Sequence, residues 1–214
     1  MDEHFAHFKS LLDREDREGA VDYVLGLLQR DEVDIVTLYE QIIGPAINDM
    51  SCTIDGKWCI WKEHIRTSIA ATVLGCSYPY VMRERRERHA IDGGKVIVAR
   101  PPEEYHEIGA RMVADLFTLC GHEVTFIGAN TPNLEVATAV NFINPRYLAI
   151  SVSNSYNLFA AERTISAVRG SVVGKPPTII VGGSAFERNP NAWKEIGADR
   201  LARTYADIAG LREG

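Results

Sequence analysis

Residues 95–109 read KVIVARPPEEYHEIG and pass from an apolar run through a polar loop to the start of a helix. The run 95–99 is short, β-branched and apolar on both faces, which is typical of a strand buried in a parallel sheet. The loop that follows carries a histidine between carboxylates. Because parallel sheets bind ligands at the carboxyl ends of their strands, this loop is a candidate functional site.

The alternation of strand and helix continues to the end of the chain. Five strands separated by helices predict a doubly wound, flavodoxin/Rossmann-like parallel five-stranded sheet with helices on both faces. The predicted strands are 95–99, 124–127, 147–152, 178–181 and 200–202, and the predicted helices are 108–119, 134–142, 159–168, 191–196 and 205–211.

The first part of the chain has a different pattern. Between Phe5 and Arg88 apolar residues recur at helical spacing and strand-like runs are absent, which predicts an N-terminal four-helix bundle. Asp34 is a predicted N-cap, and Gly44-Pro45 is expected to kink or divide one helix. The predicted fold is therefore α + α/β, with a helical domain over residues 1–90 and an α/β domain over residues 91–214.

The composition is that of an ordinary globular protein, with 46% apolar and 24% charged residues. The net charge of −6 argues against a general nucleic-acid binder, and the run Arg83–Arg88 alternates with glutamates as a solvated helix end does. The four cysteines form no C-x-x-C pair, no signal peptide is recognisable and no segment is apolar enough to cross a membrane. We expect a cytoplasmic protein with reduced thiols.

Three short motifs follow predicted strands. They are E-x-H-x-x-G at residues 104–109, S-x-S-x-S at residues 151–155 and Gly182-Gly183. A lone H-x-x-G would carry no weight, but three motifs in order, all on loops at one end of the sheet, indicate a shared site.

In these motifs the chain resembles the cobalamin-binding domain of methionine synthase and its relatives, whose signature is D-x-H-x-x-G, S-x-L and G-G at similar spacing. The resemblance implies that His106 is the lower axial cobalt ligand in place of the dimethylbenzimidazole of the cofactor. Glu104 would hydrogen-bond the other ring nitrogen and fix its tautomer. Gly109 would let the start of the helix pack close to the corrin.

The remaining motif residues are assigned to the displaced nucleotide tail by the same resemblance. Ser151 would hydrogen-bond the benzimidazole nitrogen, Ser153 and Ser155 would line the tail pocket, and Gly182 and Gly183 would leave room for the tail. The helical domain resembles the bundle that caps the upper face of cobalamin in the same proteins.

Two departures from the family pattern matter, and the first of them, Glu104, is commoner in the regulatory branch of the family. Glu104 stands where methyl carriers usually have aspartate, and Ser153 replaces the leucine of S-x-L, which makes the pocket more polar. In adenosylcobalamin light sensors of the MerR type, the cap has a tryptophan followed by Glu-His. Here Glu63-His64 matches, but the tryptophan position is Thr53.

Trp58 and Trp61 are then the candidate upper-face tryptophans, with bundle core as their alternative. If neither covers the upper face, the resulting opening would take a different upper ligand or a second flat chromophore such as a bilin.

The resulting prediction is a cobalamin-dependent sensor that responds to light or ligand and signals through an unidentified output protein or through self-association. Adenosylcobalamin is the expected cofactor and methylcobalamin the alternative. The alternative function is a corrinoid methyl carrier, the cobalt-bearing subunit of a methyltransferase; a storage protein and a small mutase subunit are weaker alternatives. The alternative that the α/β domain is a flavodoxin-like receiver with FMN or a phosphoacceptor is disfavoured, because a receiver needs an aspartate at the end of the third strand and Ser151 occupies that position.

Overall fold

The structure, a computed structural model, describes residues 2–49, 53–54, 57–58, 60–89, 92–187, 189 and 191–213. The chain divides into two compact units, Met1–Arg86 and Glu87–Gly214. Among the described residues, no helix is long and apolar enough to cross a bilayer. In the part of the chain that the structure describes, Cys76 and Cys120 form no disulfide.

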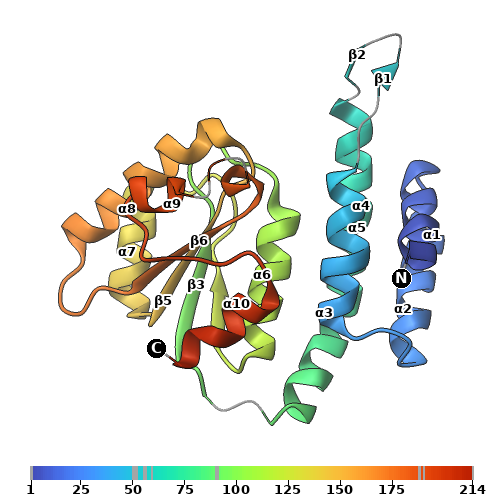
Figure 1. The fold of residues 1–214 in the computed structure, drawn as a ribbon, viewed down its shortest axis with the longest axis horizontal. Helices are drawn as coiled ribbons and strands as arrows, with labels where there is room; N and C mark the ends of the chain where they lie inside the picture. Colours follow the sequence, from blue (N-terminus) through green and yellow to red (C-terminus); the bar gives the residue numbers. More distant parts are fainter. Residues whose placement is uncertain are drawn as a thin grey trace. The chain divides into compact units, whose positions relative to one another are not determined.

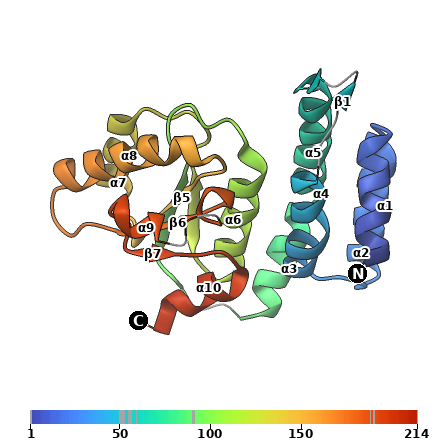
Figure 2. The same ribbon diagram turned by 45° about the horizontal axis from the view of Figure 1, so that its top comes forward.

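The first unit is helical, as predicted, and its four long helical segments can be followed in Figures 1 and 2. Their shared interior is apolar: residues such as Phe8, Leu12, Val24, Ile42 and Val73 are no more than 1% exposed. The segments are α1 (Asp2–Asp13), α2 (Arg17–Gln29), the run formed by α3 (Ile35–Thr37), a π-helix (Leu38–Ile43) and α4 (Gly44–Asn48), and α5 (Ile60–Glu87).

The third helical segment shows how the sequence sets local structure. Asp34 is the predicted N-cap, and its side chain accepts a hydrogen bond from the Thr37 amide at 2.8 Å. The chain stays helical through Gly44-Pro45, and the irregularity lies in the preceding turn as the π-helix. Proline has no N–H to donate, and a π-turn is one of the ways in which a helix accommodates such a break.

One expectation for this unit was wrong, and a second did not foresee one buried residue in a largely solvated helix end. Strand-like runs were expected to be absent, yet β1 (Thr53–Ile54) and β2 (Lys57–Trp58) pair as a short antiparallel ladder. The Asp-Gly pair between them in the sequence is a hairpin signal that the helical pattern obscured. The arginine-rich end of α5 was expected to be solvated, but Glu84 is 6% exposed and its Oε1 accepts a hydrogen bond from the Ile35 amide at 2.8 Å. Glu84 thereby caps the neighbouring helix.

The second unit contains the predicted parallel sheet, with strand order β4-β3-β5-β6-β7. The strands and helices begin and end within a few residues of the predicted positions. The strands are β3 (Lys95–Ala99), β4 (Glu123–Phe126), β5 (Tyr147–Ser151), β6 (Thr178–Gly182) and β7 (Arg200–Leu201), and the helices are α6 (Glu107–Leu119), α7 (Asn133–Ile143), α8 (Leu158–Ser171), α9 (Ala192–Glu195) and α10 (Tyr205–Ala209).

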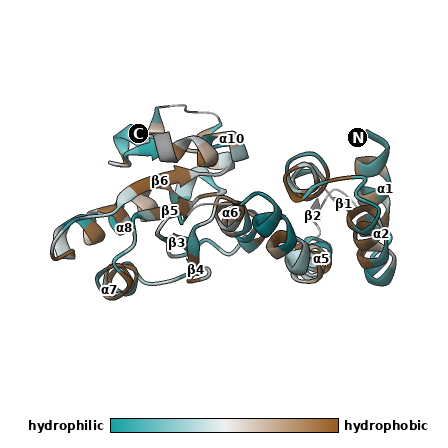
Figure 3. Ribbon diagram, turned by 90° about the horizontal axis from the view of Figure 1, so that it is seen from below, coloured by the Kyte–Doolittle hydropathy of each residue, from teal (hydrophilic) through white to brown (hydrophobic). Residues whose placement is uncertain are grey.

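Helices cover both faces of this sheet. Figures 1 and 3 show α7 and α8 on one face and α6 and α10 on the other. Ile97 and Ile150 belong to the core beneath α7 and α8, while their neighbours Val98 and Ala149 are buried as well. Strands buried on both faces have no polar alternation, which is why β5 and β6 are coloured as hydrophobic in Figure 3.

The strand order places the site. β3 lies beside β5, and the chain leaves β3 toward β4 but leaves β5 toward β6, so these two connections run in opposite directions across the sheet. At such a switch point the loops that follow the two central strands leave a crevice between them. Here these loops are residues 100–106 after β3 and residues 152–157 after β5.

Candidate cofactor site

The loop after β3 carries Glu104 inward and leaves His106 at the surface. Glu104 has no exposed surface, whereas the His106 side chain is 52% exposed. The loop adopts left-handed backbone at Glu103, with φ of 68°, and the Glu103 amide donates to Asn130 Oδ1 at 3.0 Å. Helix α6 begins at Glu107, so His106 occupies its N-cap position.

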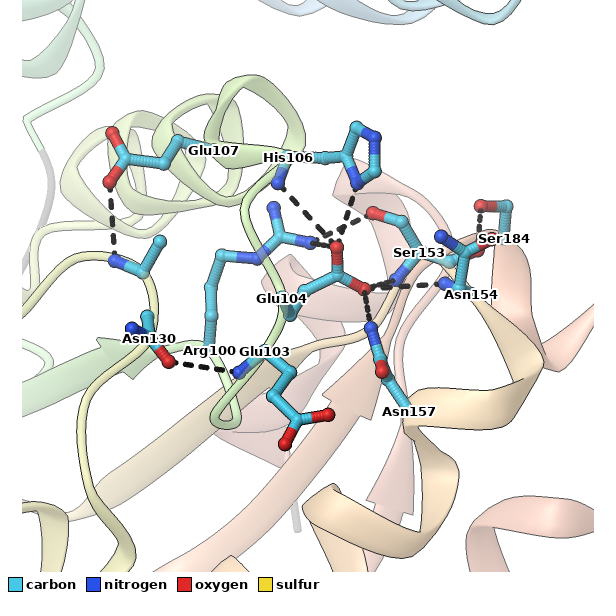
Figure 4. A network of polar contacts seen from close by, with 11 residues as sticks. Arg100, Glu103, Glu104, His106, Glu107, Asn130, Ser153, Asn154, Asn157 and Ser184 are labelled. Carbon is cyan, nitrogen blue, oxygen red and sulfur yellow. Dashed lines mark hydrogen bonds and ion pairs between the residues drawn. The ribbon is translucent and has the colours of Figure 1, made fainter.

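The buried Glu104 carboxylate is the centre of a polar network (Figure 4). Its Oε1 accepts from His106 Nδ1 at 2.8 Å and lies 3.1 Å from Arg100 Nη2. Its Oε2 accepts from two backbone amides of the β5 loop, Ser153 at 2.9 Å and Asn154 at 3.3 Å, and from Asn157 Nδ2 at 3.1 Å. The carboxylate therefore ties the loop after β3 to the loop after β5.

This network keeps Glu104 ionised. Burial alone would raise the pKa of the carboxyl, because a charge is poorly solvated in the interior. The hydrogen bonds from His106 and Asn157, the charge of Arg100 and the Ser153 amide outweigh that effect and lower the pKa of Glu104 to about 2. At neutral pH the group is a carboxylate, which can only accept hydrogen bonds.

The state of Glu104 fixes the tautomer of His106. Because both oxygens of the carboxylate are acceptors, the 2.8 Å contact requires the proton to be on Nδ1. A neutral ring protonated at Nδ1 carries its lone pair on Nε2. This is the arrangement in which histidine coordinates a transition metal, with the second nitrogen held by a carboxylate.

The surroundings of His106 offer a single metal-ligating ring and, beside it, an open stretch of helix surface at Gly109. Among the residues that the structure describes, no group of three or more His, Cys, Asp or Glu side chains could hold a metal ion by itself. Gly109 lies in the first turn of α6, three residues beyond His106, and a Cβ placed there would meet no atom within 4 Å apart from its chain neighbours and the backbone of its own helix. One histidine ligand beside open space suits a metal that arrives inside a macrocycle.

The three predicted serines lie at the end of β5 and in its loop, but in different surroundings. Ser151 is buried, with 9% of its surface exposed. The Ser153 hydroxyl accepts from Arg100 Nη2 at 2.8 Å, and Ser155 is exposed at the start of a 3₁₀ turn. Their roles toward a nucleotide tail stay predictions.

The two predicted glycines are each required by a close approach within the chain. A Cβ on Gly183 would lie 2.3 Å from the Val152 carbonyl oxygen, and Gly183 has φ of 105°, which side chains rarely adopt. A Cβ on Gly182 would lie 2.4 Å from the Ala202 carbonyl oxygen. Room for a tail at these glycines stays a prediction.

Sequence reasoning missed two buried members of the network. Arg100 is fully buried, and Asn157 is 6% exposed with its amide on Glu104. A signal for Arg100 was present, since it follows a wholly apolar strand directly and lies four residues before Glu104. No local pattern in the sequence marks Asn157, because its partner is distant along the chain.

The predicted upper-face residues belong to the helical unit. Trp61, Glu63 and His64 lie in the first turns of α5, where Trp61 is 56% exposed and Lys62 stacks on its ring. The Trp58 side chain lies outside the described residues. The exposure of Trp61 argues against bundle core, and an upper-face role for all four stays a prediction.

Solved structures similar to this chain include three cobalamin or corrinoid proteins. The Methanosarcina barkeri monomethylamine corrinoid protein matches at a TM-score of 0.79 and 14% identity, over 99% of this chain and 97% of that chain. The methanol:cobalamin methyltransferase complex MtaBC from Methanosarcina barkeri matches at 0.50 and 15%, over 100% and 79%. A cobalamin-binding protein from Desulfitobacterium hafniense DCB-2 matches at 0.49 and 16%, over 98% and 97%.

The match to the monomethylamine corrinoid protein establishes the fold, a helical region followed by a five-stranded parallel sheet with flanking helices. No curated protein sequence matches the chain. The family model of the B12 binding domain matches residues 94–210, which is more than half of the chain and includes every residue of the Glu104 network. The chain therefore belongs to the B12 binding domain family and is a cobalamin-binding protein.

Proposed function

We propose that this protein is a corrinoid methyl carrier, which holds cobalamin through His106 and passes a methyl group between methyltransferase partners. The observation that carries the cofactor assignment is the 2.8 Å contact between Glu104 and His106 Nδ1. It keeps the proton on Nδ1 of a half-exposed ring, which makes Nε2 the nitrogen that would bind a metal. The bound cofactor would supply cobalt as the site where the methyl group is carried.

The residues of the chain have separate tasks in this proposal. His106 would hold the cobalt, and Glu104 would fix the tautomer and orientation of its ring. The open space at Gly109 takes the edge of the corrin. The Ser151 hydroxyl donates to the displaced nucleotide base, and Ser153 and Ser155 line the tail pocket. Either adenosylcobalamin or methylcobalamin satisfies these contacts; a methyl carrier would work with the methyl form.

The choice of carrier over sensor is supported by the fold likeness. The match to the monomethylamine corrinoid protein extends over nearly all of both chains. The MtaBC structure is a complex of a cobalamin protein with a methyltransferase, so the expected partner here is a methyltransferase subunit. The comparisons thus favour the alternative drawn from the sequence over the light- or ligand-responsive sensor.

The assignment is tested with purified protein mixed with hydroxocobalamin under anaerobic conditions and passed over a desalting column. We expect the wild-type protein to retain the corrin, and after one-electron reduction to Co(II) to give an electron paramagnetic resonance (EPR) signal split by one axial nitrogen. His106→Ala should lose that splitting. His7→Ala, an exposed histidine in the helical unit, is the control and should keep it.

A second experiment separates carrier from sensor. The loaded protein is reduced to Co(I) with Ti(III) citrate and treated with methyl iodide, and a carrier should show the methylcobalamin spectrum while still bound. In parallel, protein loaded with adenosylcobalamin is illuminated with green light. A change in elution volume after illumination, with no methylation in the first experiment, would reject the carrier in favour of the sensor.

A further inference from the structure

Arg100 is a buried cation with few partners. It lies at the end of β3 and, like Glu104, has no exposed surface. Its Nη2 atom is 3.1 Å from Glu104 Oε1 and donates to the Ser153 hydroxyl at 2.8 Å. Its Nε and Nη1 atoms are buried too and have no hydrogen-bond partner among the described residues. Within the described part of the chain, two of the three guanidinium nitrogens therefore have no hydrogen-bond partner.

This arrangement is a poor one for stability alone. A buried guanidinium loses its hydration, and each unpaired donor adds to that cost. Burial lowers the pKa of Arg100, against the opposing effect of the Glu104 charge. Buried ion pairs of this kind are often replaced by apolar residues with little loss of stability. Packing alone therefore does not explain why an arginine occupies this buried position.

The position of Arg100 supplies one. Its Nη2 and the Nδ1 of His106 contact the same carboxylate oxygen, Oε1 of Glu104 (Figure 4). A carboxylate that accepts from an imidazole strengthens the other ring nitrogen as a donor. The Arg100 guanidinium contacts the same Oε1 and balances its negative charge. The His106 ring therefore hydrogen-bonds to a neutral ion pair instead of an uncompensated carboxylate.

We propose that Arg100 is a positioning residue that weakens His106 as an axial donor to cobalt by sharing Oε1 of Glu104. This inference rests on the proposed function, because it requires cobalamin held through His106. It also gives the two unused nitrogens a reason: the cation is placed where its charge acts on Oε1, and not where its donors are best satisfied.

The test compares wild-type protein with Arg100→Met, Arg100→Gln and Arg100→Lys, all loaded with cobalamin and reduced to Co(II). Removal of the charge in the Met and Gln variants should strengthen the axial bond. The EPR spectrum should then show a larger nitrogen splitting and a smaller cobalt splitting. The Lys variant retains the charge and should return to the wild-type spectrum. The control is Arg169→Met, since Arg169 pairs with Asp199 at 2.8 Å on the surface.

The outcomes separate the two proposals. Wild-type protein that retains no cobalamin, or retains it without an axial nitrogen, would reject the proposed function. Wild-type protein with an axial nitrogen, and Met and Gln variants with the same spectrum, would overturn the role of Arg100 alone. A Lys variant that matches the Met variant would also overturn it, since charge would then not be the cause. If the Met variant does not fold, the Gln variant, whose amide still reaches polar partners, decides the question.

Discussion

The Glu104→Gln substitution tests whether the buried carboxylate organises the site. The carboxylate accepts from His106 and Arg100 on Oε1 and from Ser153, Asn154 and Asn157 on Oε2. A glutamine has one oxygen and one NH₂ group, so one of the two sets of donors then faces another donor. If the NH₂ replaces Oε1, it faces the donors of His106 and Arg100. If it replaces Oε2, it faces the backbone amides of Ser153 and Asn154 and the side-chain NH₂ of Asn157.

The expected cost follows from these contacts. Hydrogen bonds to a charged group contribute about 1.5–3 kcal/mol each, and at least two are lost in either orientation. Arg100 would also remain buried without its counter-charge, and breaking a buried pair in this way costs about 3–5 kcal/mol. These effects share one cause and do not add in full. We expect the free energy of unfolding of the cofactor-free protein to fall by about 3–5 kcal/mol.

The assay is urea denaturation followed by circular dichroism, with Glu107→Gln as the matched control. Glu107 lies three residues further on, and its pair with Arg111, at 2.7 Å, is about half exposed on the arginine side. An exposed pair contributes about 0–1 kcal/mol, so the control should lose little. A loss of under about 1 kcal/mol for Glu104→Gln would refute the argument that the carboxylate is the structural centre of the network.

Three further substitutions test other parts of the α/β unit. Gly183→Ala should lower the free energy of unfolding by about 1–3 kcal/mol, because its φ is 105° and its Cβ would meet the Val152 carbonyl; an unchanged urea midpoint would contradict this. Gly109→Ala should leave the free energy of unfolding unchanged or raise it by about 0.5–1 kcal/mol, since alanine favours a helix. The same substitution should weaken cobalamin retention on a desalting column. Unchanged retention would show that the corrin does not pack against Gly109. Asp207 is a pH probe: burial raises its pKa, but bonds from the Arg203 and Thr204 amides and the Thr204 hydroxyl lower it overall. The pKa of Asp207 is thus lower in the folded than in the unfolded chain. Its contribution to the free energy of unfolding is therefore present above the unfolded pKa and is lost as pH falls through the folded pKa. Asp207→Asn should therefore flatten the acid side of a stability-against-pH curve, and an unaltered curve would show that the cap does not act this way.

Local pattern determined most of the fold. The apolar runs of the sheet are buried on both faces, so they carry no polar residues and can be recognised without any partner. Helical spacing marked the four helices of the first unit for a similar reason. The small hairpin of β1 and β2 was missed because two-residue strands are too short for any periodicity to show.

The candidate site also contains some residues that local sequence indicates and others that only the fold brings together. His106 and Glu104 are two residues apart, so their pairing was visible in the sequence, and the resemblance to the family supplied the chemistry. Asn157 joined the network only in the folded chain, because it lies on the loop after β5 while Glu104 lies on the loop after β3. Arg100 lies on the same loop as Glu104, and only the fold shows that its side chain turns inward to the carboxylate.

The sequence by itself determined which residue types stand at the strand ends and that a histidine is accompanied by a carboxylate. Only the tertiary structure decided how that carboxylate is held. Strand order sets β3 beside β5, and this brings Ser153, Asn154 and Asn157 to a carboxylate some fifty residues earlier in the chain. Burial then makes each of those contacts strong, since an interior has little water to compete for the charge. The ionisation of Glu104, and with it the tautomer of His106, is therefore a property of the fold.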